Sequence, residues 1–272
     1  MSAIHLKAYA SLWRIRFING LQYRAAALAG IATQLFFGFV FMMIFMAYYE
    51  NSGVSPDLSI QQLVTYVWLQ QMFVAFIMLW YRDNELFTMI TDGNIAYELC
   101  RPVNMYVFWF VKLLAQRMAS ALLRSLPIML VVFFLPEPYR MSLPDSPASF
   151  VLFLVALMLG LLVVVAISML IYISVFWTMS PVGSTLMIAV IGEFFAGLII
   201  PVPLMPEWLQ SIVYALPFRF TADFPFRVYS GHIPVNEAIT GIGLQLLWIL
   251  ALAVVGQWLM RRALRSVIVQ GG

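Results

Sequence analysis

The side chains of this chain that could do chemistry are few, and a dense group of them lies in one polar stretch at residues 81–104. Only 10% of the 272 residues are charged, and this stretch concentrates Arg82, Asp83, Glu85, Asp92, Glu98 and Arg101. Mixed charges on a short segment favour recognition of one partner surface, because they set specificity more than affinity. The same pattern also fits an ordinary solvated loop, so both interpretations stand.

Catalytic chemistry has little support in the sequence. No GxxxxGK[ST] phosphate loop is present, and neither Lys7 nor Lys112 lies in a glycine-rich turn. His5 and His232 fall on opposite sides of the membrane in the topology given below, and Cys100 stands alone. No group of residues has the spacing of a metal site. We therefore expect no catalytic residue, no metal and no directly bound cofactor in this chain.

Glu193 is an acid inside a long apolar run, LMIAVIGEFFAGL. An ionised acid at the centre of a bilayer costs about 2.5 to 3.5 kcal/mol on insertion scales, so it must face protein or water, pair with a cation, or be protonated. One interpretation is that Glu193 lines a substrate path in which Phe194 and Phe195 form an aromatic wall. The other is a buried structural pair, for which Arg124 is the nearest candidate in depth.

The composition places these residues in an integral membrane protein. Hydrophobic residues make up 63% of the chain, against roughly 45 to 50% in soluble domains. The apolar runs approach the roughly 20 residues that a helix needs to cross a bilayer and are longer than the strands of a membrane barrel. The predicted fold class is therefore an all-α bundle, with residues 1–272 as a single domain.

Six apolar runs predict six transmembrane helices. Their approximate ranges are residues 25–48, 61–80, 107–135, 149–177, 184–200 and 238–260. Six spans put both termini on one side of the membrane, and the distribution of Lys and Arg decides which side. Of the 15 such residues, the outer loops hold only Arg140, Arg219 and Arg227. Both termini and residues 81–104 are therefore expected to be cytoplasmic.

Two basic regions contribute to that count. Residues 1–24 carry Lys7, Arg14, Arg16 and Arg24 without an acid, which predicts a segment lying at the inner membrane surface. The first turns of the third span carry Lys112, Arg117 and Arg124. We expect these long side chains to reach towards the aqueous phase, as basic side chains near membrane interfaces do.

The polar stretch itself has the signals of two short helices. Asp83 or Asn84 can cap a helix with Glu85 in its first turn, and Gly93 suits its end. A second helix starting at Asn94 must end before Pro102. The predicted shape is a compact helix–turn–helix unit at the membrane surface.

Residues 201–237 form the second irregular region. The prolines at 201, 203, 206, 217 and 225 prevent any long helix here. Pro206 suits the first position of a helix that would span about residues 208–216, too short to cross a bilayer. The aromatic side chains, Trp208 among them, suit interfacial depth. The segment is expected to enter the outer leaflet and return, or else to lie on the bundle as a compact external loop.

These features together resemble the permease of a type-2 ABC exporter from bacteria. The resemblance rests on GNIAYELCRPVN after the second span, IIPVPLMPEWLQSIVYALPF after the fifth, and the terminal LRSVIVQGG. It implies that residues 1–24 are a connecting helix, residues 81–104 a cytoplasmic coupling segment, and residues 201–237 an external re-entrant hairpin. In such permeases the coupling helix sits in a cleft of a separate ATPase subunit.

The resemblance also assigns residues to roles. The coupling contact with the ATPase falls on Glu85, Leu86, Phe87, Asp92, Gly93, Tyr97, Glu98 and Arg101. The walls of the path fall on the second and fifth spans, at Gln71, Phe73, Glu193, Phe194 and Phe195. The hairpin is marked by Pro201, Pro203, Pro206, Trp208 and Pro217.

The expected partners follow from the same resemblance. Two ATPase copies would bind ATP and magnesium, and a second permease, often a related but different chain, would complete the path in the bacterial inner membrane. A largely apolar, aromatic wall favours an amphipathic, lipid-like, peptide or drug cargo, exported by alternating access. No nucleic acid is expected. The alternatives are a secondary transporter, which often has inverted repeats that are missing here, and a non-transporting membrane scaffold.

Overall fold

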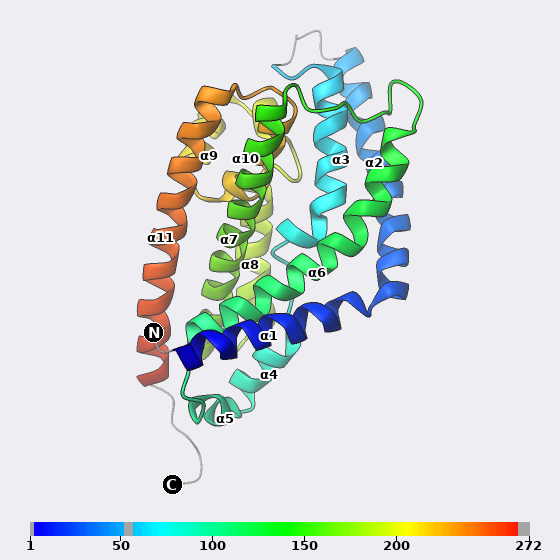
Figure 1. Cartoon of the computed structure of the whole chain (residues 1–272). Coiled ribbons are helices and arrows are strands. Elements are labelled where there is room, and N and C mark those ends of the chain that lie inside the picture. Colours follow the sequence, from blue (N-terminus) through cyan, green and yellow to red (C-terminus); the bar gives the residue numbers. More distant parts are fainter. Residues whose placement is uncertain (1–2, 52–56, 266–272) are drawn as a thin grey trace.

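The computed structural model describes residues 3–51 and 57–265, and every regular element in these ranges is a helix. Five helices are long and apolar enough to cross a membrane. They are α2 (Arg24–Asn51), α3 (Ile60–Ile77), α6 (Met105–Phe133), α7 (Pro147–Thr178) and α11 (Val235–Arg265). The predicted all-α membrane fold is confirmed for the described residues (Figure 1).

The predicted fifth span differs from the structure in length and position. Helix α8 (Pro181–Phe195) has 15 residues, which at 1.5 Å per residue is about 22 Å, less than the roughly 30 Å of a hydrocarbon core. The helix ends early because Gly197 has φ 79°, a conformation that leaves the helix. Glu193 therefore lies in the last turn of α8, not midway along a span ending at residue 200. A sixth full-length spanning helix is not found in the described residues.

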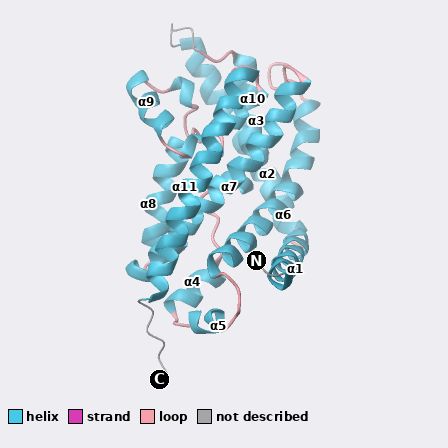
Figure 2. Ribbon diagram, turned by 60° about the vertical axis from the view of Figure 1, so that its left-hand side comes forward, coloured by secondary structure: helices cyan, strands magenta, loops and turns pink. Residues whose placement is uncertain are grey.

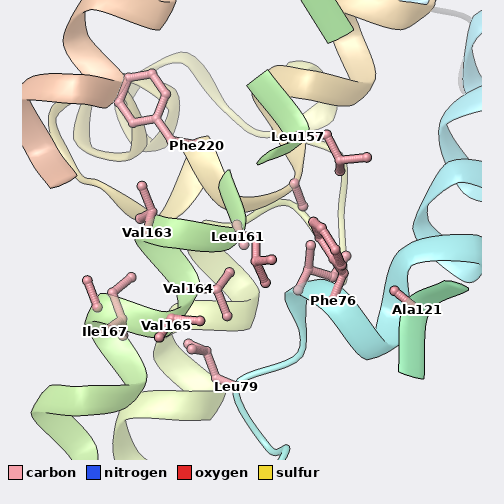
Figure 3. Close-up of a cluster of buried hydrophobic side chains, with 14 of the residues drawn as sticks. Phe76, Leu79, Ala121, Leu157, Leu161, Val163, Val164, Val165, Ile167 and Phe220 are labelled. Atoms are coloured by element: carbon pink, nitrogen blue, oxygen red, sulfur yellow. The ribbon is translucent and has the colours of Figure 1, made fainter. Parts of the chain in front are cut away.

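Helix α7 forms the centre of the bundle. Residues 163–167 of this helix are almost completely buried, because α3, α6, α8 and α11 all pack against it. Figure 3 shows Leu161 and Val164 of α7 in one cluster with Phe76 of α3 and with Leu79. At Gly160, an added Cβ would lie 2.8 Å from the carbonyl oxygen of Phe220. A larger residue there would push the segment that contains Phe220 off α7.

One end of the bundle carries the short polar helices. Helix α1 (Ala3–Leu21) runs along α6, and α4 (Asn84–Thr91) and α5 (Ile95–Leu99) lie beside it at the lower end in Figures 1 and 2. The contact between α1 and α6 is close, since a Cβ at Gly20 would lie 2.6 Å from the Cβ of Ala119. The described end of α11 reaches the same end of the bundle (Figure 1).

The other end is closed by short helices between α8 and α11. These are η1 (Val202–Leu204), α9 (Glu207–Ala215), η2 (Phe218–Thr221) and α10 (Asp223–Tyr229). The short helix predicted at residues 208–216 is confirmed as α9. Helix α10 is not predicted by the sequence pattern, and all seven of its residues are buried. This helix packs against α7 and α3, so the end of the bundle is filled by protein.

Candidate functional site

The polar stretch folds as its sequence predicts. Asp83 caps α4 by accepting a hydrogen bond from the backbone N–H of Leu86, at 3.3 Å. Gly93 has φ 75° and separates α4 from α5, whose N-cap is Asn94. Helix α5 ends at Leu99, before Pro102. The two-helix unit is therefore confirmed, and its N-terminal end is fixed by a side chain of its own.

A partly buried charge network connects the start of α4 to the rest of the protein. Lys112 of α6 lies 2.9 Å from Asp83 Oδ2 and 2.8 Å from Glu85 Oε2. Arg16 of α1 donates two hydrogen bonds to the carboxylate of Glu85, at 3.0 and 3.2 Å, the strong two-pronged geometry of a guanidinium with a carboxylate. The hydroxyl of Tyr172 on α7 accepts a 2.7 Å hydrogen bond from the Asp83 N–H. Three helices thus hold one end of α4.

The charge of Glu85 is stabilised by this network. Burial raises its pKa, but hydrogen bonds and positive charges from Lys112 and Arg16 outweigh burial and lower the pKa from 4.5 to about 2. Glu85 therefore stays ionised at any physiological pH, and the network keeps its ion pairs.

The expectation that Lys112 and Arg117 reach the aqueous phase is wrong. Lys112 is 2% exposed and Arg117 is 0% exposed. Arg117 donates to the carbonyl oxygens of Phe76 (3.3 Å) and Met78 (2.7 Å) and to the hydroxyl of Ser168 (3.1 Å). The two carbonyls belong to the last turn of α3 and the residue that ends it, where unpaired carbonyls and the helix dipole favour a cation. Arg117 can be buried because three oxygen atoms inside the protein accept its hydrogen bonds.

The residues assigned to the ATPase contact fall into two groups. Leu86 and Phe87 are buried, and Phe87 packs on Tyr172 with ring centroids 4.5 Å apart. Glu85 is held by Arg16 and Lys112. These three residues attach α4 to its own chain.

The remaining assigned residues lie on the outer surface of the unit. Tyr97 is 75% exposed, and Asp92, Gly93 and Arg101 are exposed as well. Glu98 is buried but pairs with Arg101 at 3.0 Å, which orients the arginine. This surface, made of Asp92, Gly93, Tyr97 and Arg101, is named the coupling face below.

A cavity of about 500 Å³ lies among α2, α3, α6 and α8. Gln71 and Glu193, both predicted to line the path, meet in its wall together with Gln34, Gln70 and Arg124. The rest of the wall is mostly apolar, with Phe37, Phe41, Val74, Ile77, Met78, Leu198 and Ile199. The sequence did not point to Gln34 and Gln70, although amides in apolar runs are a usable signal.

Glu193 has a partner other than the one considered from the sequence. One carboxylate oxygen accepts a 2.9 Å hydrogen bond from the indole N–H of Trp80. The other oxygen is buried without a hydrogen-bond partner in the described residues. Arg124 lines the same cavity but forms no ion pair with Glu193 in the described structure.

The three phenylalanines assigned to the path lie outside this cavity. Phe194 and Phe195 pack on each other at 5.5 Å, and Phe195 stacks on Phe218 of η2 at 6.3 Å. Phe73 faces Phe76 and Phe153, on the side of α3 that packs against α7. The aromatic wall expected around Glu193 is replaced by Phe37 and Phe41 of α2.

The region of the predicted hairpin is anchored to α3 through Tyr66. Its hydroxyl donates to the carbonyl oxygen of Gly197 at 3.0 Å and can also donate to Asp223 Oδ1 at 3.3 Å. Asp223 pairs with Arg227 at 3.3 Å. Tyr66 of α3 thus contacts both the residues just after α8 and the start of α10.

The prolines of this region shape its turns. Pro201, Pro203 and Pro217 are buried, while Pro206 and Trp208 are exposed. Pro206 is the N-cap of α9, whereas the sequence predicted it at the first helical position. The outward apolar face of α9 carries Trp208 and Ile212. An exposed apolar face on a helix too short to span suits interfacial depth.

The comparison with known families decides the class of the protein. Residues 34–271 match a family described as "ABC-2 family transporter protein". The chain belongs to this ABC-2 transporter family. Proteins of the family are the membrane permease component of ABC transporters and work with an ABC ATPase in a membrane. Comparison with curated proteins gives no significant match.

In this ABC-2 permease, the sequence predicts the two-helix unit of α4 and α5, named the coupling unit below, but not the side chains that hold it. The sequence marks Arg16, Lys112 and Arg117 only as part of an excess of basic residues, because it does not show which helices are neighbours. No group of three or more His, Cys, Asp or Glu side chains that could hold a metal lies together in residues 3–51 and 57–265. The terminal motif spans residues 264–272, and all of it after Arg265 lies outside the described residues.

Proposed function

We propose that this chain is the membrane half of an ATP-driven exporter whose coupling face receives movement from a separate ATPase. The observation that carries the proposal is the capped helix α4, which is fixed to α1, α6 and α7 by Arg16, Lys112 and Tyr172. A helix held by three others moves them when it is pushed. An ordinary solvated loop has no need of such a network.

The contacts support a route for that movement across the membrane. Residues 78–83 join α3 to α4, and Arg117 holds both the end of α3 and Met78. At the other end of α3, Tyr66 touches Gly197 and Asp223. A tilt of α3 as one body would therefore act on the end of α8 and on α10, which close the external side. This is alternating access driven by ATP bound elsewhere.

The cavity that contains Gln71 and Glu193 is the proposed part of the substrate path in this chain. Its apolar wall with a few amides and one carboxylate suits an amphipathic, lipid-like, peptide or drug cargo. The unpartnered oxygens of Gln34 and Glu193 are the polar groups that would orient such a cargo. Export as the direction of transport comes from the family resemblance.

The proposed assembly contains two permeases and two ATPase subunits, with ATP and magnesium held in the ATPases. The second permease is proposed to be a related but different chain. The excess of Lys and Arg at the end that carries α1, α4 and α5 supports a bacterial cytoplasmic membrane with both termini inside. The helix α8 with residues 196–206 would supply the sixth crossing.

The test is purification of the tagged chain from its native membranes, followed by identification of what accompanies it and an ATPase assay. A phosphate-loop subunit should co-purify with the wild-type chain and be lost, with the ATPase activity, in the double variant Tyr97→Ala, Arg101→Glu. The matched control is Arg140→Glu, an exposed charge reversal at the opposite end of the bundle. Recovery of the wild-type chain alone, or equal recovery of the ATPase with the double variant, would overturn the proposal in favour of a secondary transporter or scaffold.

A further inference from the structure

A second cavity, of about 380 Å³, lies among α1, α2 and α6 at the end of the bundle that carries the coupling unit. Its polar wall is made of Arg16, Asn19, Gln116, Ser120 and Arg124 with the tyrosines at 23 and 81. None of its lining residues is an acid, and two are arginines. The cavity therefore offers positive charge and hydrogen-bond donors to a ligand.

Arg124 is the basic residue of this cavity that has no partner. It forms no ion pair, hydrogen bond or ring contact with another described residue, whereas Arg16 is paired with Glu85. The other basic residues of α6 have partners: Lys112 pairs with two acids, and Arg117 donates to two carbonyls and a hydroxyl. Arg124 is half-buried in the cavity wall. An unpaired guanidinium at membrane depth is costly, and an anion bound in the cavity would lower that cost.

Gly30 of α2 leaves the space that this guanidinium occupies. An added Cβ at this glycine would be only 2.9 Å from Arg124 Cζ. The side-chain oxygen of Gln116, in the wall of the same cavity, is buried without a hydrogen-bond partner. Glu85 is paired with Arg16 and Lys112. Glu193, in the neighbouring cavity that Arg124 also lines, accepts a hydrogen bond from Trp80 and forms no ion pair with Arg124 in the described structure.

Arg124 lies between two cavities whose walls differ in chemistry. Arg124 lines both this cavity and the largely apolar cavity that contains Gln71 and Glu193. Along α6 it lies five residues beyond Ala119, the contact with α1, which is about 7 to 8 Å in a helix. If α1 lies at the inner membrane surface, Arg124 is close enough to that surface for a lipid headgroup to reach it.

We propose that Arg124 binds the phosphate-type anionic headgroup of an inner-leaflet amphiphile, whose apolar part extends towards the cavity of Gln71 and Glu193. The inference rests on the proposed function for the orientation in the membrane, and it adds the charge class of the ligand. Arg16, Asn19 and Ser120 are the further donors around the headgroup. The bidentate geometry of a guanidinium with a phosphate makes Arg124 the main determinant of affinity.

The test uses the purified full chain in nanodiscs of phosphatidylcholine, without any ATPase. Short-chain phosphatidic acid, short-chain phosphatidylcholine and inorganic phosphate are added separately, and the thermal unfolding midpoint is followed by intrinsic tryptophan fluorescence. Phosphatidic acid should raise the midpoint in the wild type. Arg124→Gln should weaken the apparent affinity at least tenfold, Arg124→Lys less, and the control Arg14→Gln, an exposed arginine of α1 outside the cavity, not at all.

The outcomes are distinguishable. A phosphatidic-acid effect that Arg124→Gln abolishes supports an amphiphile site, and an equal effect of inorganic phosphate supports the same anion site with a soluble ligand. Equal stabilisation by phosphatidylcholine, or an unchanged response in Arg124→Gln, overturns the proposal. If Arg124→Gln does not fold, Ser120→Leu, which fills the cavity, must abolish the response. Loss of the ATPase interaction would leave this measurement unaffected, so the two proposals can fail separately.

Discussion

At the scale of the residue, buried basic side chains of this permease lie opposite backbone carbonyl oxygens or acidic side chains. Arg117 is the clearest case, because it satisfies two carbonyl oxygens at the end of α3 and the hydroxyl of Ser168. It also lies 5.1 Å from the ring of Tyr81 in the segment joining α3 to α4. One buried cation therefore fixes the point where the membrane helix and the coupling helix meet.

Replacing Arg117 with Met should destabilise the protein. The apolar stem would be kept, but the carbonyls of Phe76 and Met78 would lose a buried donor, which costs about 1 to 3 kcal/mol for unsatisfied groups. A thermal unfolding scan of the purified chain in detergent measures the effect. Arg117→Lys should recover only part of the loss, because an ammonium cannot span the three acceptors as the planar fork does. An unchanged midpoint in Arg117→Met would contradict the assigned role, and Arg14→Met, at an exposed site, is the control.

Glu85 makes the coupling network sensitive to strong acid only. Its pKa in the folded protein, about 2, is below its ordinary value of 4.5. A lowered pKa stabilises the fold fully above the unfolded value, and this contribution is lost as pH falls towards the folded value. The difference in unfolding midpoint between wild type and Glu85→Gln should be constant from pH 7 to about 5 and shrink between 4.5 and about 2. A difference that changes between pH 7 and 5 would contradict this assignment.

At the scale of the element, local signals and tertiary packing contribute differently. The two short helices of the coupling unit were predictable because Asp83, Gly93 and Pro102 set helix ends that lie only a few residues away in the sequence. The early end of α8 was harder to predict, since its apolar run continues to Ile200 and only the positive φ of Gly197 stops the helix. The burial of Lys112 and Arg117 could not be predicted, because it depends on which helix ends lie opposite them. Gln71 and Glu193 line one cavity; the sequence pointed to Glu193 through its place in an apolar run, and to Gln71 through the expected walls of the path.

Tyr66 is the element-scale link between α3 and the external segment. In Tyr66→Phe the ring should stay in place against Phe226, from which its centroid is 5.5 Å, while the hydrogen bonds to Gly197 and Asp223 are lost. The expected result is faster hydrogen exchange at residues 197–205 and in α10, by roughly tenfold for a loss of about 1.4 kcal/mol. Exchange in α1 should not change.

The matched control for this prediction is Tyr139→Phe. The hydroxyl of Tyr139 makes no hydrogen bond with another described residue, although its backbone oxygen accepts one from Trp68. The control should therefore leave exchange in α10 as it is in the wild type. If both variants, or neither, alter exchange in α10, the link from α3 through the Tyr66 hydroxyl is refuted.

At the scale of the whole molecule, the permease has one end that carries the proposed coupling face and another that is filled by its own short helices. The end with α1, α4 and α5 exposes the coupling face, whereas all of α10 is buried at the opposite end. The charge networks follow the same division, with Arg16, Lys112 and Glu85 at one end and Asp223 and Arg227 at the other. Helix α3 reaches both networks, directly through Tyr66 and through residues 78–83.

Cys100 allows this polarity to be tested in the unmodified protein. It is the single cysteine of the chain, it is exposed, and it lies next to Arg101 of the coupling face. A membrane-impermeant maleimide should leave it unlabelled in intact cells and label it in inverted membrane vesicles, because the coupling unit is expected to be cytoplasmic.

In vesicles that retain the ATPase, labelling of Cys100 should be slow. It should become fast when the ATPase is stripped off or when Tyr97→Ala, Arg101→Glu prevents its binding. Labelling of Cys100 from outside intact cells would reverse the topology. Equal rates with and without the ATPase would show that the partner docks on another surface, and the proposed coupling face would then be wrong even if the ATPase co-purifies.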